Sequence, residues 1–191
     1  MRFFLLAIIF FFNLQSLTKA NDIREFEIEG ISISDSLLNF AEEKKILSSI
    51  SSQQYPNDKF IIYEADNYLN IEKYDYIGVT TLKDDKDYIV TNISGMINYK
   101  NLQECLNLKK EIQNSIEEII IYDEKEEVKY QMENNDGTIY GVQYYLKPYP
   151  FIEAIVINCY HFTTESKRTR NLSVSANSEI FAKFLTKEAY K

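Results

Sequence analysis

Alternating hydrophobic and polar positions mark several segments of this chain as strands of a half-buried sheet. Phe26 and Ile28 alternate with three glutamates, a period of two that ends near Gly30. Similar alternation, or a short apolar run, predicts further strands over 59–64, 74–82, 88–98, 128–133, 138–146, 151–162 and 172–176. The run 154–157 is apolar on both faces, which predicts a central strand that is covered on both sides.

The connections between these strands carry turn residues. The charged segment 83–87 predicts a five-residue hairpin loop. An acidic loop is expected at 123–127, and Asp136-Gly137 predicts a tight hairpin between the strands at 128–133 and 138–146. Pro148 and Pro150 predict a rigid connection, because each proline fixes φ and restricts the residue before it. Gly95 marks either a bulge or a close approach of another chain segment.

A long amphipathic helix is predicted after Asn101, which is a good N-cap with Glu104 three residues later. Its apolar positions recur every three or four residues and are expected to face the sheet: Cys105, Leu108, Ile112, Ile116 and Ile119. Its polar positions are expected to face solvent: Lys109, Lys110, Glu111, Asn114, Glu117 and Glu118.

Shorter helices are predicted at both ends of the chain. The polar triplet 34–36 precedes a helix with a break near Ala41, whose buried residues are expected to be Leu37, Leu38, Phe40, Ile46, Leu47 and Ile50. Asn177 is expected to cap a last helix that buries Ile180, Phe181, Phe184 and Leu185. The fold class is therefore α+β, a single domain with a mostly antiparallel sheet and helices packed on it.

Residues 1–20 have the pattern of a secretory signal peptide. Arg2 precedes the apolar run FFLLAIIFFF, and Thr18-Lys19-Ala20 is a small-x-small cleavage site. A retained anchor is the alternative, but a run of about 10 to 12 apolar residues is shorter than the ~20 that a membrane span needs. We expect a periplasmic or secreted protein of residues 21–191, with no membrane span in the mature chain.

The mature chain is strongly acidic. Cleavage removes Arg2 and Lys19, so the net charge of −8 becomes −10. This balance disfavours nucleic acid and anionic membrane surfaces as partners.

The chain has two cysteines, Cys105 and Cys159. In an exported protein they most simply form one disulfide, and two buried free thiols are the alternative. A disulfide between them would join the long helix to a strand of the sheet.

The segment FEIEGISISDSLLNF at 26–40 resembles a family of small exported bacterial proteins of uncharacterised function. The C-terminal LSVSANSEIFAKFL and the two cysteines, one in the central helix and one in a late strand, resemble the same family. The family position of Ser34 is usually glycine, so this chain departs from it at a tight turn. The resemblance implies export and a shared fold, and it carries over no catalytic or binding residue.

Templates for catalysis and metal binding do not fit the chain. There is one histidine, His161, and we expect it at a strand end, although it is also the one candidate for a histidine base. The motifs GxSxG, HExxH, GxGxxG and the P-loop are absent. Asp84, Asp85 and Asp87 offer oxygen ligands for calcium but lack the glycine and distal glutamate of an EF-hand loop. We predict no cofactor and no metal.

Two groups of residues remain as candidate contacts to a ligand or partner. The first is aromatic: Tyr144, Tyr145, Tyr149 and Phe151. The second is basic and could meet a phosphate or carboxylate: Lys167, Arg168 and Arg170. Core packing and a solvated loop are the respective structural alternatives.

Export, a possible disulfide and the lack of a catalytic set favour a non-enzymatic module that binds an unknown protein or small molecule. The alternative is an envelope hydrolase that uses carboxylates, since acidic residues are abundant. A structural role in envelope assembly is a third possibility.

Overall fold

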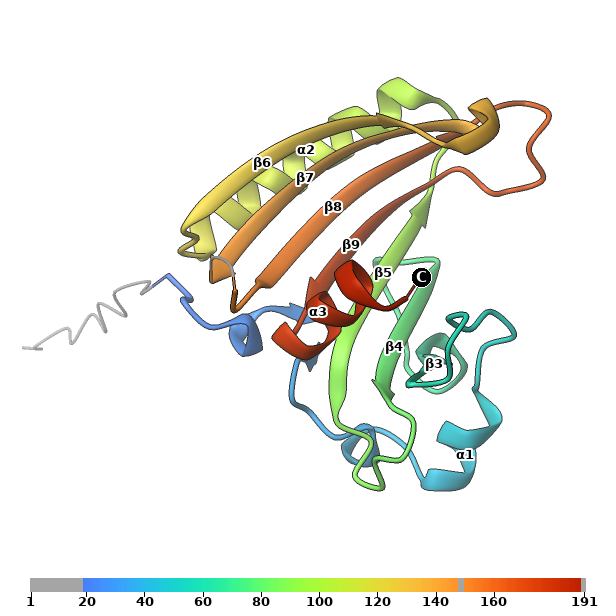
Figure 1. The fold of residues 1–191 in the computed structure, drawn as a ribbon, viewed down its shortest axis with the longest axis vertical. Coiled ribbons are helices and arrows are strands. Elements are labelled where there is room, and N and C mark those ends of the chain that lie inside the picture. Colours follow the sequence, from blue (N-terminus) through green and yellow to red (C-terminus); the bar gives the residue numbers. More distant parts are fainter. Residues whose placement is uncertain (1–18, 148–149, 190–191) are drawn as a thin grey trace, which may run out of the picture.

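The computed structural model of the protein describes residues 19–147 and 150–189. One antiparallel sheet of seven strands dominates it, in the order β3-β4-β5-β9-β8-β7-β6. The strands are β3 (Phe60–Glu64), β4 (Tyr76–Leu82), β5 (Val90–Asn98), β6 (Glu124–Gln131), β7 (Gly137–Lys147), β8 (Glu153–Phe162) and β9 (Asn171–Asn177). Helix α2 (Leu102–Ile119) lies behind this sheet and helix α3 (Glu179–Lys187) in front of it in Figure 1. The predicted α+β class is confirmed.

The segment before β3 consists of short elements. Strands β1 (Glu27–Ile28) and β2 (Ile31–Ser32) form a two-stranded sheet, and α1 (Glu43–Ser48) follows. Short 3₁₀ turns occupy Ile23–Glu25, Leu37–Asn39, Ala65–Asn67 and Glu133–Asn135. The helix predicted near residue 37 is thus a 3₁₀ turn and a separate α1. Some apolar residues expected to be buried there are exposed, namely Leu38, Leu47 and Ile50.

A disulfide joins Cys105 of α2 to Cys159 of β8, with 6.1 Å between the two Cα atoms. Both cysteines are fully buried, in the same core as Ile155 and Ile157 of β8. The predicted link between the long helix and the sheet is confirmed.

The inner face of α2 differs from the predicted one. Lys109 and Gln113 are buried, although Lys109 was predicted to face solvent, and Ile119 is 51% exposed. The Lys109 Nζ donates to the Gly141 carbonyl at 3.3 Å, so the aliphatic stem packs in the core while the ammonium finds an acceptor. Asn101 caps the helix by accepting from the Glu104 N–H at 3.0 Å, and the Glu104 carboxylate accepts from Lys100 N–H.

Helix α3 is held on the front of the sheet by aromatic packing. The Phe60 ring lies 5.3 Å from that of Phe181 and 4.7 Å from that of Phe184, centroid to centroid. The N-cap of α3 is Ser178 and not Asn177 as predicted. Asn177 is the last residue of β9, and its Oδ1 accepts from Asn92 Nδ2 at 2.8 Å.

The β6–β7 hairpin corrects two predictions. Residues 124–127 were predicted as a loop but belong to β6. This edge strand exposes most of its side chains to solvent, so it can carry many charged residues. The left-handed positions of the turn are Asn134 and Asn135, with φ of 55° and 58°. Gly137 is needed for another reason: a Cβ there would lie 2.6 Å from the His161 carbonyl oxygen.

Gly95 marks a close approach and not a bulge. A Cβ at this position would lie 2.4 Å from Cδ1 of Tyr74, whose ring packs on the glycine. The register shift in the β4–β5 ladder falls instead between Thr80 and Thr81.

Most of the predicted signal peptide lies outside the described residues, which begin with Lys19 and Ala20. The Ala20 N–H donates to the Ile119 carbonyl, and the Ala20 carbonyl accepts from Ile121 N–H, each at 2.7 Å. Within the described ranges, no helix is long and apolar enough to span a membrane.

Candidate ligand-binding site

The predicted aromatic group is divided between two faces of the sheet. Tyr144 is fully buried on the α2 side, where its hydroxyl donates to Glu117 Oε1 at 2.8 Å. Tyr145, the next residue, points to the opposite face, and its hydroxyl donates to Gln143 Oε1 at 2.7 Å. Tyr144 is therefore a core residue and is removed from the predicted contact surface.

Phe151 is 57% exposed at the start of the segment that leads into β8. The Lys183 ammonium of α3 lies over its ring, 5.4 Å from the centroid. Tyr149 lies outside the described residues. The structure thus brings one member of the aromatic group, Phe151, next to α3.

The predicted basic group lies at the opposite end of β8. Arg168 packs over the ring of Phe162, 5.6 Å from the centroid, and the Arg170 Nε donates to the Phe162 carbonyl at 2.9 Å. Lys167 is exposed in the same loop. In Figure 1 the connection that carries them, between β8 and β9, and the start of β8 are at opposite ends of the sheet. The aromatic and basic groups therefore do not form one surface.

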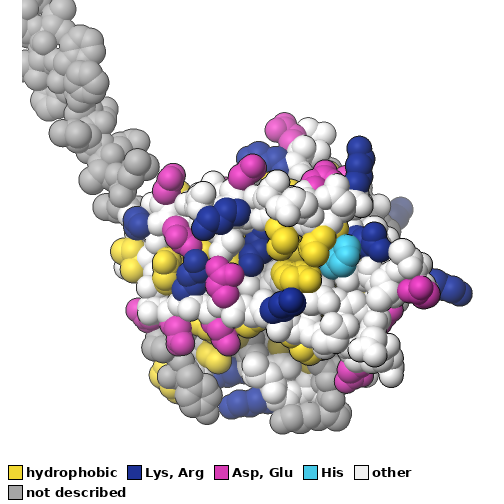
Figure 2. Space-filling model, turned by 90° about the horizontal axis from the view of Figure 1, so that it is seen from above, with side chains coloured by type: hydrophobic (Ala, Val, Ile, Leu, Met, Phe, Trp, Pro, Cys, Tyr) yellow, Lys and Arg dark blue, Asp and Glu magenta, His cyan; other side chains and the backbone are white. Residues whose placement is uncertain are grey.

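His161 is at a strand end, close to an aromatic ring. In Figure 2 the single histidine, in cyan, lies beside a group of hydrophobic side chains that has basic residues on both sides. Its ring stacks on Tyr99, whose hydroxyl lies 3.2 Å from Nδ1 and donates to the Tyr160 carbonyl at 2.9 Å. Burial, helped by the Arg170 charge, lowers the pKa of His161 and so favours the neutral ring.

The described residues contain no group of three or more His, Cys, Asp or Glu side chains placed to hold a metal ion. At the hairpin tip that suggested calcium, Asp85 accepts backbone N–H bonds from Asp87 at 3.0 Å and Ile89 at 2.9 Å. The Asp85 carboxylate therefore stabilises the hairpin loop to which it belongs.

A hollow of about 410 Å³ lies where the N-terminal segment, the start of β8 and the start of α3 meet. Its volume lies within the range of about 300–1,000 Å³ typical of small-molecule sites. Isoleucines form the apolar part of its wall, namely Ile23, Ile33 and Ile180. Charged or hydroxyl side chains form the rest, namely Arg24, Ser34, Glu153, Ser178, Glu179 and Lys183.

A second hollow, of about 560 Å³, runs along α2. Its wall comes from that helix and its cap alone, and includes Asn101, Asn107 and Glu111. Because one helix cannot surround a ligand, the smaller hollow, walled by three segments, is the better candidate site.

The N-terminal wall is fixed by a short 3₁₀ turn. Asp22 caps this turn by accepting from the Arg24 N–H at 2.9 Å, while Ile23 is anchored in the core. The Arg24 side chain also donates to the Asp22 carboxylate, and these bonds lower the pKa of Asp22 to about 2. Ser34, on the same wall, has φ of 75°, a left-handed value that favours glycine.

The sheet contributes Glu153 to the wall, and this residue forms an ion pair across the β7–β8 ladder. Lys147 and Glu153 are opposite each other after a register shift, and the Lys147 Nζ donates to Glu153 Oε1 at 2.9 Å. The bond to Glu153 raises the pKa of Lys147, and the charges of Asp22 and Glu179 add to this effect. The Lys147 ammonium is therefore close enough to Asp22 and Glu179 to be influenced by their charges.

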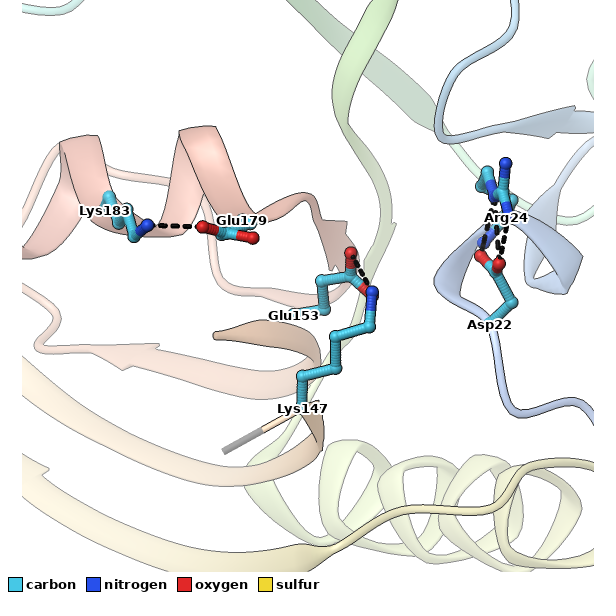
Figure 3. Close-up of polar contacts among 6 residues, drawn as sticks. All are labelled: Asp22, Arg24, Lys147, Glu153, Glu179 and Lys183. Carbon is cyan, nitrogen blue, oxygen red and sulfur yellow. Dashed lines mark hydrogen bonds and ion pairs between the residues drawn. The ribbon is translucent and has the colours of Figure 1, made fainter. Parts of the chain in front are cut away.

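Figure 3 shows how the pairs are arranged. The Lys147–Glu153 pair lies between Asp22–Arg24 of the N-terminal segment and Glu179–Lys183 of α3. The three cations and three carboxylates of these pairs together carry no net charge.

Two polar atoms of this wall are buried without a hydrogen-bond partner. Six such side-chain atoms occur among the described residues, and two of them, Glu153 Oε2 and Ser178 Oγ, belong to the wall of this hollow. The Glu153 side chain is only 13% exposed. Ser178 is the N-cap of α3, yet its hydroxyl makes no capping bond. Each of the two atoms has less than 1 Å² of exposed surface, so neither faces the open space of the hollow.

Little in the sequence indicates this site. Its residues come from three segments, near 22–34, 147–153 and 178–183, and none of them forms a local motif. The spacing of four residues between Glu179 and Lys183 is visible in the sequence, but such i,i+4 pairs are common on exposed helices and do not indicate a site.

Compared with known proteins, the chain matches no family model, no curated protein and no solved structure. The resemblance to a family of exported bacterial proteins remains a prediction.

Proposed function

We propose that this protein is an exported, non-enzymatic binding module that holds a small ligand in the hollow beside α3. The observation that carries the proposal is the hollow of about 410 Å³ itself, whose wall combines isoleucines with charged and hydroxyl side chains from three segments of the chain.

Export is part of the proposal. A disulfide and the lack of a spanning helix in the described part of the chain are compatible with an extracellular or periplasmic protein. The signal-peptide pattern of residues 1–20 supports the same location.

The test compares native and denatured mass spectra of the protein recovered from the exported fraction of its producing cells. We expect the denatured mass to show the loss of residues 1–20, and the native mass to exceed it by the mass of a ligand. Glu153→Gln should lose this excess. Glu118→Gln, which removes the same charge from the exposed side of α2, should keep it. A bare native mass in all three proteins would contradict a small ligand and favour a protein partner or an assembly role.

A carboxylate hydrolase is the second candidate, because two carboxylates, Glu153 and Glu179, belong to the wall of the same hollow. This function predicts turnover of envelope polysaccharides with a bell-shaped pH profile. Turnover should be lost in both Glu153→Gln and Glu179→Gln. Inactivity of the unaltered protein across a panel of such polymers would exclude it.

A further inference from the structure

We infer that strand β6 is an interface through which two copies of this chain pair edge to edge, antiparallel, about a two-fold axis at Val128. The inference goes beyond the ligand-binding function proposed above and concerns a different part of the molecule. It follows from the open edge of the sheet, from the order of charges along β6 and from an unpaired cation, Lys129.

The two edges of the seven-stranded sheet differ in how they are covered. Strand β3 forms one edge, where the Ser51 N–H donates to the Ile62 carbonyl at 2.9 Å. The Glu64 N–H of the same strand donates to the Ser49 carbonyl at 2.7 Å. Strand β6 forms the other edge, and within the described ranges no segment except β7 pairs with it. An open edge of eight residues is a ready template for a strand of another molecule.

The backbone groups that β6 leaves free belong to alternate residues. The Met132 N–H donates to the Gly137 carbonyl at 2.8 Å, so the residues two, four and six positions before Met132 also bond to β7. The residues between them direct their N–H and C=O groups to the open edge, namely Lys125, Glu127, Lys129 and Gln131. In an antiparallel pair with a second β6, these residues bond to one another.

One register of the two strands is complementary. With Val128 on the two-fold axis, Glu127 of each copy is directly opposite Lys129 of the other, so the same ion pair forms twice. The two valines face each other at the short distance of a pair without backbone bonds. The outer pairs contain no like charges, namely Lys125 with Gln131 and Glu126 with Tyr130.

The neighbouring registers are unfavourable. An axis at Glu127 or at Lys129 would place two like charges directly opposite each other, which destabilises a strand pair. An axis at Glu126 would do the same. Charges on an edge strand usually prevent pairing with other chains. The charges of β6 therefore reject most strands and most registers, and they favour one arrangement with a second copy.

The central ion pair uses groups that the single chain leaves available. Lys129 is exposed and has no carboxylate within ion-pair distance in the described part of the chain; its ammonium lies 5.2 Å from the centroid of the Tyr140 ring. Glu127, two positions away, is on the same face of the strand. Its side chain is 60% exposed, and its contacts to Lys109 and Lys125 are long, at 3.4 and 3.6 Å. The carboxylate can therefore accept a further bond.

One strand from each copy is a small interface compared with the about 1,200–2,000 Å² of a stable complex, so we expect a reversible dimer. The test is sedimentation velocity of the exported protein, with its disulfide intact, from about 1 μM to about 1 mM. Lys129→Glu replaces two ion pairs by two repulsive pairs and should raise the dissociation constant by about tenfold or more. Lys110→Glu makes the same charge change on the exposed side of α2 and should leave the dimer unchanged.

Crosslinking through introduced cysteines tests the register. Val128→Cys places the two thiols opposite each other on the axis, where the Cα atoms lie within reach of a disulfide. Tyr130→Cys, on the same face of β6, places them four residues or about 14 Å apart. Mild oxidation should therefore link copies of Val128→Cys much faster than copies of Tyr130→Cys. The fully buried pair of Cys105 and Cys159 is protected from exchange with the new thiols.

A monomer at every concentration would overturn the inference. A dimer that Lys129→Glu leaves intact would also overturn it, because the copies would then meet at another surface. Equal rates of crosslinking in the two cysteine variants would exclude the register centred on Val128. The native mass keeps these results apart from the ligand proposal, since a second copy doubles the mass and a small ligand adds little to it.

Discussion

The Nζ of Lys109 lies 3.3 Å from the carbonyl oxygen of Gly141, within the layer between α2 and the sheet. The Lys109 side chain is only 8% exposed, while Glu127, whose Oε2 lies 3.4 Å from the same ammonium, is 60% exposed. The lysine therefore crosses the buried layer and reaches both a backbone acceptor and a solvated carboxylate.

Replacing Lys109 by alanine should lower the free energy of unfolding by about 1–3 kcal/mol. The change removes a charge-assisted hydrogen bond and the packing of the aliphatic stem, while the ion pair to exposed Glu127 adds little. Urea denaturation measures the difference. Lys110→Ala, one residue along on the exposed side of α2, should change stability by less than about 0.5 kcal/mol. Equal effects of the two substitutions would contradict a structural role for Lys109.

Loss of the disulfide should destabilise the protein by about 4 kcal/mol, because the link between Cys105 and Cys159 closes a loop with a separation of 54 residues. The measurement compares the unaltered protein with the double variant Cys105→Ala, Cys159→Ala in guanidinium chloride. Both cysteines are fully buried, so a mild reductant should open the bond only when denaturant is present. Alkylation followed by intact mass detects the opened form. Rapid reduction of the folded protein would contradict this packing.

Gly137→Ala should lower stability by about 1–3 kcal/mol, because the new Cβ would meet the His161 carbonyl oxygen and the Phe162 Cα of the neighbouring strand. Both are backbone atoms of β8, which the paired strand holds in place. Asp136→Ala, at the preceding residue, should have an effect below about 0.5 kcal/mol, since its ion pair to Arg168 is long and partly exposed. Thermal unfolding of the two variants measures the two losses of stability. A larger loss in Asp136→Ala than in Gly137→Ala would indicate that the turn, and not the contact with β8, determines the sequence here.

Two buried tyrosines predict a loss of stability in alkali. Burial raises the pKa of Tyr99 and of Tyr88 to about 12, from an ordinary value of 10.0. The folded state therefore retains protons that the unfolded state releases. This contribution is complete below pH 10 and is lost as the pH rises through about 12. Tyr99→Phe should reduce the pH dependence of stability between these values, at a loss near neutral pH of about 1 kcal/mol for the bond to the Tyr160 carbonyl. The exposed Tyr130 supplies the control, and Tyr130→Phe should leave the dependence unchanged. Phenolate absorbance and unfolding curves at each pH provide the measurement, and equal curves for both variants would refute the prediction.

Local patterns in the sequence were enough to predict much of the fold. The Asn101 cap and the apolar spacing after it predicted α2, and two cysteines in an exported chain predicted the link from Cys105 to Cys159. Alternation predicted the hairpins β4–β5 and β6–β7. In each case the deciding interactions lie within a few residues of the chain, or between the only two residues able to form the bond.

The failures have common physical causes. The face of α2 was assigned from apolar residues alone, which overlooked Lys109, because a long stem can be buried while its charged end finds a partner. The acidic run before Val128 was assigned to a loop, but an edge strand keeps its backbone pairing on one side and tolerates charge on the other. Ser178 and Glu153 line the same hollow only after β8 and α3 have packed, and no local pattern contains that information.

Strand β9 is fourth in the seven-strand order, although it is the last strand in the sequence. It connects β5, which precedes α2, with β8, which follows it. Without β9 the remaining strands form two separate sheets of three, each with an open hydrogen-bonding edge. Joining them pairs residues as distant as Ser94 and Ser175, 81 positions apart, and such non-local pairing forms slowly. A chain that ends before Asn171 should therefore yield two unjoined half-sheets, and the whole fold depends on the arrival of its C-terminal segment.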